Sequence, residues 1–105
     1  MYVHELNSRA TLDLASVLND NDDWKVVASN YGFTNIEISN FRTVGMKPGC
    51  SPAESMIKGL GMRNCKIEEL FLQLFHLRFM HAMHVLKPYV PTKYVRKHSS
   101  KILII

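Results

Sequence analysis

The stretch SPAESMIKGLGM, residues 51–62, decides the fold class because it holds the clearest helix start in the chain. Ser51 and Glu54 form a capping box, in which each side chain can hydrogen-bond the free backbone N–H of the other residue. Pro52 takes the first helical position, where its missing N–H is not needed. The apolar residues of the stretch share one helical face: Ala53, Met56, Ile57 and Leu60. We predict a helix that ends at Gly61, with Met62 in contact with Ile57.

Three further helices are predicted before this stretch. The first covers about 8–19 behind the possible caps Asn7 and Ser8, and its apolar face is Leu12, Leu14, Ala15, Val17 and Leu18. The second begins near Asp22 and ends at Gly32, a residue suited to the left-handed conformation after a helix. The third begins at a capping box, Thr34 with Glu37, and leads into a loop rich in glycine and proline: Gly45, Pro48 and Gly49.

Two more helices are predicted after it, because the apolar stripe that starts at Ile67 is out of phase with the one that starts at Phe79. The break falls near 76–78, and Pro88 and Pro91 end the last helix. No segment shows the alternation of apolar and polar residues that is typical of a half-buried strand. The sequence therefore predicts an all-α fold of six helices, with one domain over 1–90 and a basic tail or linker over 91–105. We expect these residues in the core: Trp24, Val27, Ala28, Phe41, Ile57, Leu60, Leu70 and Leu74.

The charge of the chain is uneven. The chain has 105 residues, 47% of them hydrophobic, and a formal net charge of +4. Residues 1–86 carry eight basic and nine acidic side chains, whereas 87–105 carry five basic and none acidic. The nearly neutral charge of residues 1–86 argues against a nucleic-acid partner. The alternative function for the chain is a small helical nucleic-acid-binding domain that uses its basic tail. That tail could be a tether, or its apolar run 102–105 could dock on Leu72 and Phe75.

The sequence shows no pattern typical of an enzyme, a metal site or a membrane span. His76, His81 and His84 lack an acid or cysteine at ligand spacing, and the acidic run 19–23 fails the calcium-loop pattern. That run is either an acidic contact patch or a solvated loop that caps the next helix. Cys50 and Cys65 are predicted to be free thiols. The longest apolar run, 102–105, is too short to cross a bilayer, and we expect a cytoplasmic protein without a cofactor.

Several motifs together resemble one family. These are Asp-Trp-Lys at 23–25 with Gly-Phe at 32–33, and the segment from Ser51 through Asn-Cys at 64–65 to Leu70. They are similar to the death domains of the Pelle, Tube and interleukin-1-receptor-associated kinase family, over about 8–90. The resemblance implies a six-helix antiparallel bundle with Greek-key topology. It also implies a non-catalytic module of Toll/interleukin-1-receptor-type innate immune signalling, which joins adaptors and clusters a Pelle-like serine/threonine kinase by homotypic contacts.

The resemblance also implies which surfaces bind a partner. The partner would be an adaptor or kinase with its own death domain, or a further copy of the chain in a homo-oligomer. The expected interface residues are Asp22, Lys25, Arg42, Lys47, Arg63, Lys66, Glu68 and Glu69. Reversal of Asp22 or Arg42 is expected to abolish partner binding without changing the melting temperature. The alternative for each residue is an ordinary solvated charge.

Overall fold

The computed structural model describes residues 1–91 of the chain, and this part is all-α, without a strand. The helices are α1 (Ser8–Asn19), α2 (Asp23–Tyr31), α3 (Asn35–Gly45), α4 (Pro52–Met62), α5 (Ile67–His76) and α6 (Met80–Leu86). Three short 3-10 helices accompany them: η1 (Val3–Glu5), η2 (Asp20–Asp22) and η3 (Lys87–Tyr89). The predicted all-α class is therefore confirmed for the described residues. The interpretation of 92–105 as a basic tail lies outside them.

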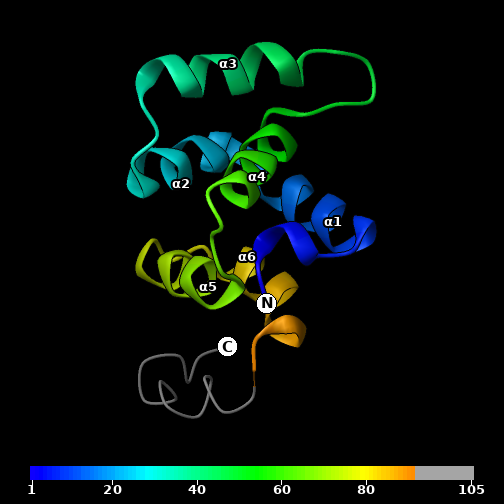
Figure 1. The fold of residues 1–105 in the computed structure, drawn as a ribbon, viewed down its shortest axis with the longest axis vertical. Coiled ribbons are helices and arrows are strands. Elements are labelled where there is room, and N and C mark those ends of the chain that lie inside the picture. The colour runs from blue at the N-terminus through cyan, green and yellow to red at the C-terminus, as the bar shows by residue number, and fades with distance from the viewer. Residues whose placement is uncertain (92–105) are drawn as a thin grey trace.

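Helix α4 lies at the centre of the helix packing. It packs against α1, α2, α3 and η1, while α6 packs against α1 and α5. In Figure 1, α3 lies at the top of the molecule, and α5, α6 and η3 lie toward the other end. The core runs between these ends and is built from fully buried side chains, among them Trp24, Leu60 and Phe71. The helices are short, so their stability depends on this shared core rather than on helix propensity alone.

The helix starts follow from local hydrogen bonds. Asn7 caps α1, because its Oδ1 accepts from the backbone N–H of Ala10 at 2.8 Å. Thr34 and Glu37 form the complete capping box at the start of α3. At α4, the Ser51 hydroxyl accepts from the N–H of Glu54 at 3.2 Å, with Pro52 in the first turn. These starts lie where the sequence places them, since each uses groups within one turn of the chain.

Helices α2 and α5 end in the same way, with a left-handed residue followed by an aromatic residue that packs on the core. After α2, Gly32 has φ +98° and the N–H of Phe33 donates to Ala28 O at 3.0 Å, as predicted. After α5, Arg78 has φ +64° and the N–H of Phe79 donates to Leu74 O at 2.9 Å. Both patterns are Schellman motifs, which satisfy carbonyls that the helix leaves free.

The predicted end of α4 is wrong. The helix continues to Met62, and the left-handed residue is Asn64 (φ 57°), with the N–H of Cys65 donating to Leu60 O at 3.1 Å. Met62 is 86% exposed instead of packed on Ile57. Gly61 lies inside the helix, where a Cβ would come 3.0 Å from the Cβ of His4. Its small size thus lets the N-terminal segment approach α4.

One residue of the predicted apolar face of 8–19 and one expected core residue also need correction. Leu12 is 53% exposed, because α1 turns its Leu14, Ala15 and Leu18 toward the core instead. Phe41 is only partly buried and packs its ring edge-on against Phe33, with centroids 5.0 Å apart. The other seven residues expected in the core are buried.

Candidate functional site

The first group of predicted interface residues lies on the edge formed by α2 and α3. Asp22 precedes α2 and its Oδ2 is 3.3 Å from an Arg42 guanidinium nitrogen on α3. The same guanidinium lies over the Trp24 ring, 5.4 Å from the centroid. Lys25 is exposed one turn after Asp22. We call these four residues the α2–α3 edge. Within this edge, Arg42 is contacted from two sides, by the Asp22 carboxylate and by the Trp24 ring.

The loop before α2 does not cap that helix with a side chain. Asn21 and Asp22 adopt left-handed backbone conformations, with φ 55° and 57°. The side chain of Asp22, the residue before α2, makes no hydrogen bond to the first turn of that helix. The pKa of Asp23 is raised, first by burial and then by the nearby charge of Asp20. The interpretation of 19–23 as a side-chain cap for α2 is therefore wrong.

The second group lies at the turn between α4 and α5. Arg63 reaches back to α3, where its guanidinium is 2.8 and 3.1 Å from the two carboxylate oxygens of Glu37. The guanidinium also lies 3.9 Å from the centroid of the Phe33 ring. The pKa of Glu37 is lowered, first by the hydrogen bond from the Thr34 N–H and further by Arg63. Glu37 belongs to this surface, although the sequence indicated it only as a capping residue.

The N-terminal segment covers part of the same turn. The N–H of Val3 donates to Cys65 O at 2.8 Å, and the N–H of Ile67 donates to Met1 O at 2.9 Å. This pairing places Tyr2 opposite Lys66 in a single antiparallel bridge. The amino group of Met1 lies 3.6 Å from Oε1 of Glu68, which is partly buried. Glu68 is therefore less available to a partner than the sequence suggested.

The remaining predicted residues are exposed and separate. Lys47 lies in the turn after α3, where its backbone carbonyl accepts from Cys50 N–H at 3.0 Å. Within 1–91, four of the predicted residues have an exposed side chain without an ion-pair partner: Lys25, Lys47, Lys66 and Glu69. The structure thus brings Asp22, Lys25 and Arg42 together and leaves the others spread over the α3–α4 loop and the α4–α5 turn.

The two cysteines are free, as predicted, and they differ in environment. Cys50 is exposed and Cys65 is fully buried. Burial raises the pKa of the Cys65 thiol to about 11, although a hydrogen bond with Tyr31 acts in the opposite direction. At neutral pH this thiol is protonated and packs as a small apolar side chain.

Among residues 1–91, no three side chains of the histidine, cysteine, aspartate and glutamate types lie close enough to hold a metal ion together. His76, His81 and His84 are exposed. None of the helices in this part of the chain has the length and apolar character needed to cross a membrane. Comparison of the chain with protein-family models, curated proteins and solved structures finds no match in any of the three.

Proposed function

We propose that residues 1–90 form a non-catalytic interaction module of the death-domain type, acting in the cytoplasm. It joins an adaptor or kinase that has its own death domain, and so clusters a Pelle-like serine/threonine kinase in a Toll/interleukin-1-receptor-type complex. The module makes and breaks no bond. Its effect is to raise the local concentration of the proteins attached to it, which is sufficient to speed reactions between them.

The observation that carries the proposal is the order of the α2–α3 edge. Arg42 is fixed by Asp22 at 3.3 Å and by the Trp24 ring at 5.4 Å, so its charge is presented in one place. A side chain that is already ordered loses less conformational entropy when a partner binds. Lys25 beside it is exposed and has no ion pair within 1–91, which leaves it available to an acidic group on the partner.

The Asp22–Arg42 pair changes which variant tests the proposal. Reversal of either residue alone breaks an intramolecular ion pair, and exposed pairs contribute up to about 1 kcal/mol to stability. Such reversals should therefore also lower the melting temperature, so they do not separate binding from stability. Lys25→Glu reverses a charge on the same edge without removing a described ion pair. Lys87→Glu is the matched control, since Lys87 is an exposed lysine in η3, without an ion pair in the described part of the chain.

The experiment immobilises the full chain and both variants and exposes them to nuclease-treated cell lysate. We expect the unchanged chain and Lys87→Glu to retain a protein with a death domain, and Lys25→Glu to retain at least about tenfold less, equivalent to about 1.4 kcal/mol of binding free energy. Thermal unfolding should be the same for all three. Recovery of the same nucleic-acid-associated proteins on every bait would contradict the proposal and favour the nucleic-acid alternative.

A further inference from the structure

Two cavities border the outer face of α4, on residues that the proposed interface does not use. One, of about 790 Å³, lies between η1, α1 and α4, and we call it the α1–α4 cavity. The other, of about 300 Å³, lies between α3 and α4, and we call it the α3–α4 cavity. Three residues line both cavities: Glu54, Lys58 and Met62. They are spaced four apart on α4, so they share one face of the helix and form a ridge between the cavities, the α4 ridge.

Three large apolar side chains that the fold leaves exposed gather on this face. Met62 is 86% exposed on the α4 ridge, Leu12 is 53% exposed at the α1–α4 cavity, and Val44 is 45% exposed at the α3–α4 cavity. Apolar groups that gather in one place mark an interaction surface more clearly than single exposed ones do. Methionine adds adaptability, because its unbranched side chain fits irregular partners.

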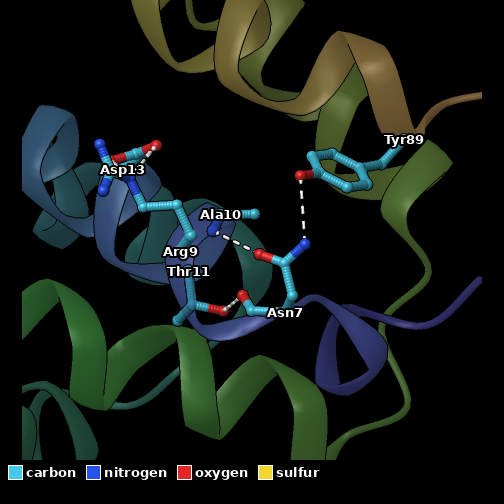
Figure 2. Close-up of polar contacts among 6 residues, drawn as sticks. All are labelled: Asn7, Arg9, Ala10, Thr11, Asp13 and Tyr89. Carbon is cyan, nitrogen blue, oxygen red and sulfur yellow. Dashed lines mark hydrogen bonds and ion pairs between the residues drawn. The ribbon is translucent and has the colours of Figure 1, made fainter.

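The α4 ridge carries one carboxylate and one ammonium group, from Glu54 and Lys58. Neither takes part in an ion pair within residues 1–91, although they are four residues apart on one helix. On α1, by contrast, Arg9 lies 3.4 Å from the carboxylate of Asp13 (Figure 2). The charges of α1 are therefore paired within that helix, whereas those of the α4 ridge are left for a group outside it.

One negative and one positive group make the α4 ridge complementary to a second copy of itself. Glu54 and Lys58 each lie two residues from Met56, about 3 Å along the helix axis. A two-fold axis at the level of Met56 therefore places Glu54 of each copy opposite Lys58 of the other, with the two helices antiparallel. In the same register, Met62 comes opposite Cys50, which lies just before the start of α4 in the other copy.

We propose that the chain forms a symmetric dimer in which the α4 ridges of two copies pack antiparallel and Glu54 of each copy pairs with Lys58 of the other. Met62 of each copy enters the α3–α4 cavity of the other copy, which Cys50 and Val44 line. A partner with charge of one sign would attract one group of the ridge and repel the other, whereas a second copy matches both. The α2–α3 edge shares no residue with the two cavities, so the inference is independent of the proposed function.

Sedimentation equilibrium of the full chain tests the dimer. We expect a monomer–dimer equilibrium that Lys58→Glu weakens at least about tenfold, because the reversal replaces both ion pairs with pairs of carboxylates. Glu54→Lys should weaken it to the same extent. An equimolar mixture of these two variants should regain the affinity of the unchanged chain to within about threefold, because every charged position then faces the opposite sign. Lys87→Glu is the control and should dimerise as the unchanged chain does, since Lys87 lies outside both cavities.

Disulfide cross-linking tests the register. Met62→Cys places a thiol opposite Cys50 of the other copy, so oxidation with copper phenanthroline should give a covalent dimer joined between positions 62 and 50, as peptide mass mapping can show. Ile36→Cys is the matched control, because Ile36 is 75% exposed and lies outside both cavities. It should give no link between positions 36 and 50. Cys65 is buried and should not compete.

Three results would overturn the inference. The first is a chain that sediments as a monomer up to about 1 mM. The second is a dimer that survives both single reversals, which would place the contact on another face. The third is a covalent Met62→Cys dimer joined between the two positions 62, which would exclude the antiparallel register. Circular dichroism of each variant separates loss of the dimer from loss of the fold.

Discussion

Gly45 is the position where a single methyl group should harm the fold most directly. It is the buried last residue of α3, and a Cβ there would lie 2.5 Å from Pro52 Cα and still closer to Pro52 N. These atoms belong to the backbone at the start of α4, so they cannot rotate away. Gly45→Ala must therefore push α3 and α4 apart, at the point where the loop between them closes.

The expected loss follows from two opposing contributions. Overpacking of a core by a methyl or methylene group costs about 1–3 kcal/mol, and a clash with backbone belongs at the upper end of that range. Replacement of glycine by alanine inside a helix stabilises that helix by up to about 1 kcal/mol. The net loss is about 2 kcal/mol, which corresponds to a fall in melting temperature of roughly 8–16 °C for a domain of this size.

The matched control is Gly59→Ala in α4. A Cβ at Gly59 would lie 2.8 Å from Cζ of Phe41, the far end of a partly buried side chain that can move. The gain in helix propensity then offsets the crowding, and we expect a change within about 1 kcal/mol. Thermal unfolding followed by circular dichroism measures both variants. A Gly45→Ala chain that melts as high as the unchanged one would refute the argument from backbone contact.

Three further predictions concern single side chains. Arg78→Gly should raise the free energy of unfolding in urea by about 0.5–1 kcal/mol, because it removes a left-handed residue that has a Cβ. Glu37→Gln should lower the free energy of unfolding at neutral pH, and the difference from the unchanged chain should vanish in acid. The pKa of Glu37 is lowered in the folded chain, so the ionised carboxylate stabilises the fold above the ordinary carboxyl pKa. This stabilisation is lost as the pH falls through the lowered pKa. An equal loss at every pH would contradict this account of its pairing with Arg63. Iodoacetamide at pH 8 should alkylate Cys50 in the folded chain and Cys65 only after denaturation, as mass spectrometry can show, because Cys65 is buried with a pKa of about 11.

The helices could be predicted well because their signals are local. The capping box at Thr34, the Ser51 side-chain cap and the left-handed Gly32 each join groups no more than five residues apart. The second half of the box predicted at Ser51, a bond from the Ser51 N–H to the Glu54 side chain, does not form. Where two local signals compete, the prediction failed. Gly61 has the residue type of a helix end, yet Asn64 provides the left-handed turn, and Gly61 instead allows His4 to approach.

The candidate site was predicted less well. The resemblance implied Asp22, Lys25 and Arg42 among eight interface residues, and in the structure these three lie on one edge. It did not indicate that Arg63 pairs with Glu37, 26 residues away, or that the N-terminal segment engages Glu68. Leu12 and Met62 were assigned to packing by their place in the pattern, and both are exposed at a cavity.

The sequence by itself determined the all-α class, the helix starts and most helix ends, because these depend on hydrogen bonds and apolar spacing within one or two turns. Only the tertiary structure decided which charges pair and which apolar groups stay exposed. Those outcomes depend on how α1, α3 and α4 pack, and the spacing of residues along the chain does not specify that packing. Gly45 illustrates the difference: its sequence context predicted a loop, whereas in the folded chain the backbone of Pro52 requires a residue without a side chain there.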